Sequence, residues 1–167
     1  MLDWYTYTDD MISVRLPARF KRSRAPTWLF KGRLRRLDAG SQLVVSIQTD
    51  VPAGVVESLT WAATNKSIGD PKSIGEWMGA TWTYRYSGVS RARQGGVEAQ
   101  ITQHGPPPGS NFHRWHILYP DRDRWVFVDV FSAMGSLPWD EFEDVTSLIM
   151  NSVRLIDNED ENGGESN

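Results

Sequence analysis

Three histidines, His104, His113 and His116, are the side chains of this sequence best suited to acid–base catalysis or to binding a metal ion. His113 and His116 lie three positions apart, and side chains at an odd separation in a β-strand point to opposite faces of the sheet. They could therefore share a metal ion only across a bulge. We predict no metal site, and we expect hydrogen-bonded structural histidines.

Other catalytic patterns are missing from the sequence. It has no cysteine to act as a nucleophile or as a thiolate ligand, and no serine lies in a Gly-x-Ser-x-Gly motif. The glycine pairs at 95–96 and 163–164 lack the strand–loop–helix setting of a phosphate-binding loop. We predict no catalytic residue and no cofactor. The alternative is a small hydrolase or isomerase that uses one of the histidines in a cleft beside residues 105–109.

Residues 21–36, which we call the basic run, are rich in bases and contain no acid. In a strand, Lys31, Arg33 and Arg35 share one face, and we call these three residues the basic strip. One interpretation is an edge strand that charge protects from aggregation. The other is a docking strip for an acidic partner or for the protein's own acidic tail. The two interpretations are compatible.

Eight tryptophans are more than a core of this size needs. We expect most of them in the core. Trp28 and Trp77 lie in or beside expected loops, where an aromatic side chain is more often an interface anchor. The candidate partner-binding residues are therefore Trp28, Trp77 and the basic strip.

The strongest structural pattern is a hairpin of residues 112–119 and 124–131 around a four-residue turn. If Tyr119 pairs with Arg124, the register follows. It sets Arg114 opposite Asp129, Trp115 opposite Val128, His116 opposite Phe127 and Ile117 opposite Val126. An Arg114–Asp129 pair is an ordinary way to fill a sheet face, and we assign it no chemistry.

The elements that position these residues follow from periodicity. Strands are expected at residues 4–8, 12–16, 30–37, 43–49, 81–86 and 97–102, besides the long hairpin, with an irregular crossing at 21–28. The first helix is expected at roughly 52–64, after the capping Asp50 and the helix-starting Pro52. A second begins at Pro138, has acids in its first turn and runs to roughly 153. Its apolar stripe comprises Phe142, Val145, Leu148, Ile149 and Val153.

Both faces of the central strands are apolar, so each face needs a cover. We therefore predict an α+β fold, with a mostly antiparallel sheet of six to eight strands and a helix on each face. Residues 1–156 form a single domain, and residues 157–167 form a disordered acidic tail that has no apolar side chain after Ile156.

Charge and hydropathy exclude several classes of protein. The formal charge is −3, and because the tail holds five acids and no base, residues 1–156 carry +2. A nucleic-acid-binding protein usually has a larger positive excess, so we expect no nucleic-acid partner. No apolar run reaches the length of a membrane span, and the first residues do not resemble a signal peptide. We expect a cytoplasmic protein.

The order of elements resembles the fold shared by PsbP, Mog1 and the bacterial DcrB-like and LpqN-like proteins. The matching features are residues 12–17 ahead of an irregular segment, residues 43–49 leading into a helix, and residues 96–99 before a long hairpin. Residues 151–154, Asn-Ser-Val-Arg, match the family's Ser-Phe-Arg-like ending, except that Val153 replaces the aromatic residue.

Members of this fold are typically non-enzymatic and dock on other proteins, and some cytosolic branches are chaperones. The resemblance therefore implies a cytosolic adaptor or chaperone-like protein. Its partner would be a polypeptide that is acidic or carries an apolar segment. The histidine-dependent hydrolase or isomerase stays open as the alternative.

Overall fold

The structure of the chain is a computed structural model, and it describes residues 2–23, 28–33, 42–65, 81–87, 95–105, 110–133 and 138–156. The predicted disordered tail, residues 157–167, lies outside these ranges.

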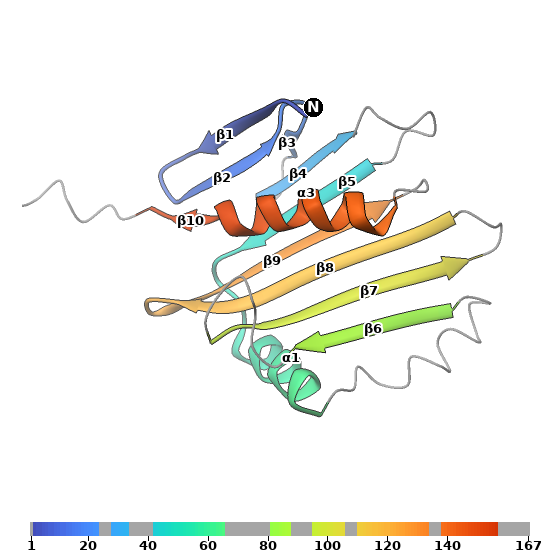
Figure 1. Cartoon of the computed structure of the whole chain (residues 1–167). Coiled ribbons are helices and arrows are strands. Elements are labelled where there is room, and N and C mark those ends of the chain that lie inside the picture. The colour runs from blue at the N-terminus through green and yellow to red at the C-terminus, as the bar shows by residue number, and fades with distance from the viewer. Residues whose placement is uncertain are drawn as a thin grey trace, which may run out of the picture.

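Seven strands form the main sheet, in the spatial order β3-β4-β5-β9-β8-β7-β6, and every neighbouring pair is antiparallel (Figure 1). In chain order they are β3 (Lys21–Ser23), β4 (Trp28–Arg33), β5 (Gln42–Gln48), β6 (Thr81–Ser87), β7 (Val97–Gly105), β8 (Ser110–Asp121) and β9 (Arg124–Ala133). The predicted antiparallel sheet and α+β class are confirmed.

A second, three-stranded sheet packs beside the first. The predicted N-terminal hairpin is present as β1 (Trp4–Thr8) and β2 (Ile12–Pro17). On its other side β2 pairs with β10 (Arg154–Leu155), a two-residue strand that the sequence did not predict. This small sheet lies over the β3–β4 end of the main sheet, on the same side as the C-terminal helix (Figure 1).

The C-terminal helix, α3 (Trp139–Ser152), covers one face of the main sheet (Figure 1). It begins at Pro138, whose carbonyl accepts a hydrogen bond from the Phe142 N–H at 3.0 Å, and acids occupy its first turn, where they complement the helix dipole. At its end, the Ser152 hydroxyl donates to the Ile149 carbonyl at 2.7 Å, and the chain then extends into β10.

The core lies between α3, the small sheet and the facing side of the main sheet. From α3 it takes Phe142, Val145 and Ile149, which are buried as predicted. Leu148 was predicted in the same stripe but is 51% exposed, because it lies on the outer side of the helix. Val153 is buried, although it follows the helix as its extended C-cap.

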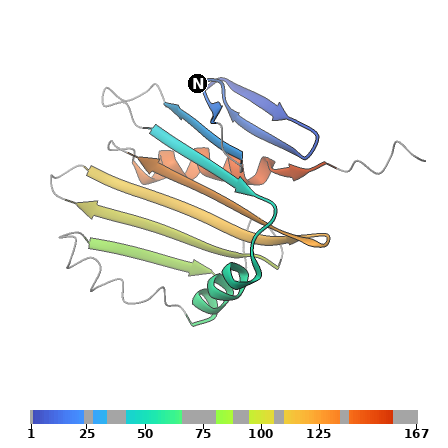
Figure 2. The ribbon, with the colours of Figure 1, turned by 180° about the vertical axis from the view of Figure 1, so that it is seen from behind.

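The first predicted helix is present as α1 (Ala53–Asn65). It contacts β7 and lies at the end of the sheet near β6 (Figure 2). No α1 side chain in the part that the structure describes is buried, and Val55 and Trp61 are 42% and 60% exposed. The expectation of a helix covering each face is therefore met by α3 and only in part by α1.

Two boundaries near the basic run were predicted wrongly. Residues 21–28 were expected to be irregular, but Lys21–Ser23 form β3 and Trp28 begins β4. β3 is only three residues long, so its sequence shows no alternation, and its pairing with β4 stabilises it.

No helix in the described part of the chain is long and apolar enough to cross a membrane.

Candidate functional site

The described part of the basic run, residues 21–23 and 28–33, lies at one end of the main sheet. β3 is the terminal strand in the described order, and its Lys21 and Arg22 are exposed. Lys31 and Arg33 lie on β4, where they pair in register with Val44 and Gln42. We call β3 and β4 together the basic edge.

The basic strip was expected on an edge strand, and this assignment is wrong for β4. β4 lies between β3 and β5, so its backbone is paired on both sides, and β3 forms the edge instead. The basic residues that protect the edge are therefore Lys21 and Arg22. Both belong to the basic run but not to the strip.

The predicted site residues fall in different places. Trp28 begins β4 and pairs with Ile47, so it alternates with the positions of Lys31 and Arg33 along the strand. Arg35 and Trp77 lie outside the residues that the structure describes. The structure thus brings Trp28, Lys31 and Arg33 to one strand.

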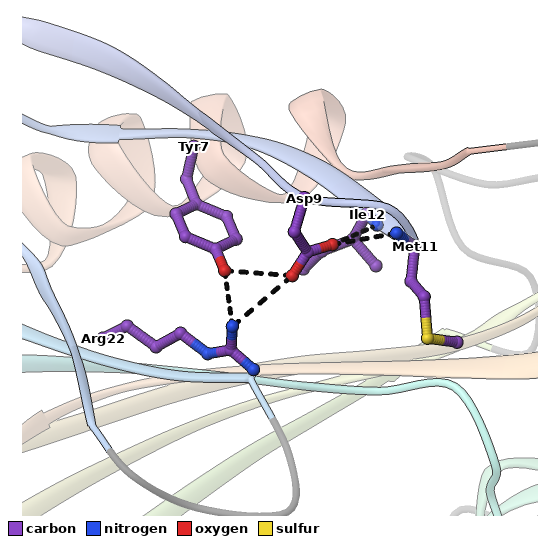
Figure 3. A network of polar contacts seen from close by, with 5 residues as sticks. All are labelled: Tyr7, Asp9, Met11, Ile12 and Arg22. Carbon is purple, nitrogen blue, oxygen red and sulfur yellow. Dashed lines mark hydrogen bonds and ion pairs between the residues drawn. The ribbon is translucent and has the colours of Figure 1, made fainter.

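Arg22 is the centre of a polar cluster that joins the two sheets (Figure 3). Its Nη1 donates a hydrogen bond to the Tyr7 hydroxyl at 2.6 Å and lies 3.5 Å from Oδ2 of Asp9. The Tyr7 hydroxyl donates to the same Asp9 oxygen at 2.9 Å. The Arg22 guanidinium carbon also lies 5.8 Å from the centre of the Tyr7 ring, within the range of a cation–π contact. We call these three residues the Arg22 cluster.

Asp9 is held in place by the turn between β1 and β2. Its Oδ1 accepts hydrogen bonds from the backbone N–H groups of Met11 and Ile12, both at 2.9 Å. A short Asp side chain that bonds to the backbone two and three residues ahead is a common turn-forming device. The remaining oxygen, Oδ2, faces Tyr7 and Arg22. Burial raises the pKa of Tyr7 first, and the hydrogen bond to Asp9 raises it further.

The sequence did not reveal the Arg22 cluster. Asp9 and Tyr7 were assigned only to a hairpin, and Arg22 only to a basic run. The cluster forms because β3 lies against a hairpin from a different sheet, and local periodicity carries no information on such a contact. The turn-forming Asp9 was the one available signal.

The histidines do not converge. His113 is buried on the face beneath α3, where its ring lies 5.2 Å from that of Trp139 and 5.4 Å from that of Phe142. His116 faces the other side of β8, so the prediction of opposite faces is confirmed. His104 pairs with Thr81, and the proposed cleft beside residues 105–109 lies mostly outside the described residues.

The predicted pairing of Arg114 with Asp129 is present but diagonal across the strands. Nε and Nη2 of Arg114 donate to the two oxygens of Asp129 at 2.7 and 2.9 Å. In register, however, Arg114 pairs with Phe131 and His116 pairs with Asp129. The predicted register is therefore wrong by two residues, while the assignment of residues to faces is correct.

The turn explains the difference in register. The pairing continues to Asp121 and Arg124, so the loop has two residues, Arg122 and Asp123, rather than four. Arg122 adopts a φ of 58°. A two-residue turn with a positive φ usually carries Gly or Asn at that position, and neither is present here to indicate it.

His116 is a buried neutral imidazole. Its Nδ1 lies 3.8 Å from Oδ1 of Asp129, too far for a hydrogen bond, and within the described structure neither ring nitrogen has a hydrogen-bond partner. Burial lowers the pKa of His116 to about 4, Asp129 partly offsets this, and Arg114 adds to it. The expectation of a hydrogen-bonded histidine is thus wrong for His116. A base with so low a pKa is weak at neutral pH.

No metal site is formed by the described residues, since no three His, Asp or Glu side chains among them gather in a suitable arrangement. In the same part of the chain, two groups of three polar side chains are the Arg22 cluster and the group of Arg114, His116 and Asp129. The two arginines are similarly exposed, at 43% for the Arg22 side chain and 41% for that of Arg114, whereas His116 and Asp129 are buried.

Comparison with known proteins shows the fold. The structure is similar to that of Mog1p, a Ran-binding protein of Saccharomyces cerevisiae, with a TM-score of 0.54 over 94% of this chain and 97% of the yeast chain. The two sequences are 10% identical, so the likeness concerns the fold alone. No protein-family model and no curated protein matches the sequence. The resemblance to the Mog1 and PsbP fold is therefore confirmed for the fold, and assignment to the bacterial branch stays a prediction. The chain has a Mog1-like α+β fold.

Proposed function

We propose that this chain is a non-enzymatic protein-binding adaptor, acting in the cytoplasm, that recognises an acidic polypeptide through its basic edge. The observation that supports it is that Lys21, Arg22, Lys31 and Arg33 lie on β3 and β4 at one end of the described main sheet, with Lys21 and Arg22 exposed. A row of cations on a sheet edge attracts a polyanionic segment and repels other edges of its own kind.

The fold supports a binding role. Mog1p, which shares the fold, is a Ran-binding protein, so this architecture serves protein recognition in at least one case. Fold alone does not determine function, and the partner has to be argued from the surface. Here the surface chemistry is basic, which favours an acidic segment over an apolar one.

Trp28 and Trp77 remain the proposed aromatic anchors for the partner, and Trp77 lies outside the described residues. Trp28 begins β4, the strand that carries Lys31 and Arg33, but it is an odd number of residues from both. Position 28 therefore lies on the opposite face of the sheet from positions 31 and 33, and a partner that uses Trp28 and the two bases has to contact both faces of the basic edge. Interfaces commonly combine a few aromatic or arginine anchors with a charged rim. In a chaperone-like version of this proposal, the tryptophans bind an apolar segment of the partner and contribute more to the affinity than the bases do.

The hydrolase or isomerase alternative receives less support from the geometry. His113 packs against α3 and His116 lies on the opposite face, so these two cannot act together on one substrate. His116 does approach the carboxylate of Asp129, but it is buried and weakly basic.

The test uses fluorescently labelled poly-L-glutamate as the acidic probe, with binding followed by anisotropy. Changing Lys31, Arg33 and Arg35 to Ser is expected to weaken binding by about tenfold or more, since each exposed pair contributes up to roughly 1 kcal/mol. Trp28→Ala is expected to weaken it further.

The matched control removes three bases elsewhere, by changing Arg122, Arg124 and Arg154 to Ser. All three are exposed, at the β8–β9 turn and on β10. The control variant is expected to bind nearly as well as the wild type. Equal losses in the two triple variants would show that only net charge matters, and the basic edge would then not be the docking surface.

A further inference from the structure

The main sheet has two faces, and α3 covers one of them (Figure 1). We call the other the far face. On β8, His113 and Trp115 belong to the side covered by α3, so Arg114 and His116, which alternate with them, lie on the far face. Figure 2 views the sheet from the far side, and within the described part of the chain no helix crosses β4, β5 or β9 there.

The register of the strands defines one row of positions across the far face. The row passes from Lys21 on β3 to Lys31 on β4, Val44 on β5, Phe131 on β9 and Arg114 on β8. Residues that lie directly opposite each other on antiparallel strands share a face, so all five positions are on the same side as Arg114. Neighbouring strands are about 4.8 Å apart, which puts positions 31 and 131 roughly 10 Å apart.

The bases of the basic edge are divided unequally between the two faces. Lys21 is exposed and pairs with Lys31, and Arg33 lies two residues farther along β4, so these three positions are on the far face. Arg22 pairs with the buried Phe30 and points to the other side, where it belongs to the Arg22 cluster. Three of the four described bases of the basic edge therefore lie on the far face.

The far face is positively charged at this end of the sheet. Its positions on β3, β4 and β5 include no acid and are occupied by Lys21, Ser23, Leu29, Lys31, Arg33, Gln42, Val44, Ser46 and Gln48. The next strand, β9, has Asp129, which accepts two hydrogen bonds from Arg114. Because that pair adds no net charge, the three bases give this part of the face a positive potential, which attracts an acidic partner.

β9 places an aromatic side chain beside these bases. Phe131 is partly exposed, whereas Val128 and Val130, on the covered side of the same strand, are buried. The Arg114 guanidinium carbon lies 5.8 Å from the centre of the Phe131 ring, a cation–π contact that helps to fix the ring. A well-positioned aromatic ring at the surface is typical of an interface anchor. Phe131 shares a face with the three bases, and position 28 does not.

From this arrangement we infer that the acidic partner docks across the far face, with its carboxylates at positions 21, 31 and 33 and an apolar side chain against Phe131. The inference rests on the proposed function, and it specifies the face and the kind of segment. The partner is an acidic polypeptide segment that also carries an aromatic or aliphatic residue. Bases beside an aromatic ring also suit single-stranded nucleic acid, but residues 1–156 carry only +2, which favours the polypeptide.

The first test compares two fluorescently labelled acidic probes of equal length, poly-L-glutamate and a random copolymer of glutamate and tyrosine. The wild type is expected to bind the copolymer about fivefold more tightly, because a tyrosine ring packs against Phe131. Phe131→Ala is expected to abolish this preference, and Phe131→Tyr, which keeps the ring, is expected to retain it. Equal affinity of the wild type for the two probes, or a preference that survives in Phe131→Ala, would refute the anchor.

A second test compares one base on each side of the molecule. Lys21→Ser is expected to weaken binding of the copolymer about threefold, the effect of one exposed ion pair. Arg15→Ser removes the same charge from an exposed position on β2, in the small sheet on the α3 side, and is expected to leave the affinity nearly unchanged (Figure 1). Equal losses in the two variants would contradict the assignment to the far face.

The third test maps the covered face directly. The chain has no cysteine, so one introduced thiol reports on one position. Ser46→Cys places it on the far face, where Ser46 is partly exposed and pairs with Asp129, and Leu148→Cys places it on the exposed side of α3. With the copolymer at about ten times its Kd, alkylation by N-ethylmaleimide should slow about tenfold at position 46 and stay unchanged at position 148. Equal effects at the two positions, or none at position 46, would overturn the inference.

These tests can fail separately from the proposed function. If the basic-strip variant loses affinity for poly-L-glutamate and its matched control does not, but position 46 is not protected, the adaptor proposal stands and the docking face is wrong. If the strip variant and its control lose equal affinity, the adaptor proposal itself fails. A labelled single-stranded oligonucleotide is tested in parallel. Tighter binding of this probe than of the copolymer, with protection of position 46, would identify a nucleic acid as the occupant and would contradict the acidic polypeptide.

Discussion

Asp129 is the acidic member of the group that Arg114, His116 and Asp129 form on the main sheet. It is 3% exposed, and it accepts two hydrogen bonds from Arg114. A buried carboxylate needs such partners, because an unpaired charge in the interior is costly. His116 lies beside the pair but is not hydrogen-bonded to it. Burial favours the neutral imidazole and outweighs the opposite effect of the Asp129 carboxylate, so the pKa of His116 is lowered.

His116 makes the stability of the protein pH-dependent. Its pKa in the folded state is about 4, below the ordinary value of 6.5, so the unfolded state takes up a proton first as the pH falls. The contribution is fully present above pH 6.5 and is lost between 6.5 and about 4. From about pH 7.5 to about pH 5 the free energy of unfolding should fall by on the order of 2 kcal/mol from this group. Urea unfolding at the two pH values measures it.

The control is His116→Gln, which has no titrating group at this position. Its stability should fall less over the same pH interval, by about the contribution assigned to His116. Identical pH dependence in the two proteins would show that His116 does not titrate with a lowered pKa.

At this scale the sequence predicts some contacts and misses others. Arg114 and Asp129 were found because they lie on strands joined by one short turn, where alternation determines the face. The Arg22 cluster was missed because Tyr7 and Arg22 lie on different sheets. Arg35 and Trp77 lie outside the described residues, so their proposed role rests on sequence alone.

Among the elements, the β8–β9 turn is the place where local strain is expected. Arg122 has a φ of 58°, a conformation that costs a residue with a β-carbon roughly 1–2 kcal/mol. Glycine avoids this cost, although it loses more entropy on folding. Arg122→Gly should therefore stabilise the protein by about 0.5 kcal/mol, as measured by chemical denaturation. Asp123→Gly, at the other position of the turn, should give no gain, and a gain of equal size there would contradict the strain argument.

Helix α3 supplies the most direct test of the core. Phe142 is fully buried between the helix and the main sheet, so Phe142→Ala should lower the free energy of unfolding by about 3–5 kcal/mol. Leu148 is on the same helix but 51% exposed, and Leu148→Ala should change it by less than about 0.5 kcal/mol. Thermal or urea unfolding of the two variants compares them directly. Similar losses would mean that the helix packs through a different side.

Element boundaries were predictable where a pattern is long. The strands of the long hairpin and the helix α3 have enough residues for their periodicity to be evident. β3 has three residues and β10 has two, too few for alternation to appear. Both exist because a distant strand pairs with them, and the sequence of a short segment does not encode its distant partner.

Over the whole molecule, the formal charge is unevenly distributed. Residues 157–167 contain five acids, and the basic run is at the other end of the chain. If the acids compete with a partner for the basic edge, the competition is limited to a Debye length of about 8 Å at physiological salt. Removing residues 157–167 should therefore strengthen binding of an acidic partner only modestly.

The fold was predictable because the order of its elements is distinctive, and the similarity to Mog1p confirms it at 10% identity. The cover of the second face was not predictable. The periodicity of α1 indicates a helix, but its described side chains are half-buried or exposed. Apolar positions in a sequence identify a face that needs cover, and they do not identify which segment provides it.

The central claim is that the basic edge docks an acidic polypeptide. Its most direct test is the affinity for labelled poly-L-glutamate as a function of ionic strength. Three proteins are compared: the wild type, the variant with Lys31, Arg33 and Arg35 changed to Ser, and the chain without residues 157–167. The strip variant should bind more weakly with a flatter salt dependence, because steering charges act mainly on the association rate, and the shortened chain should bind somewhat more tightly. Three coinciding curves would contradict the claim.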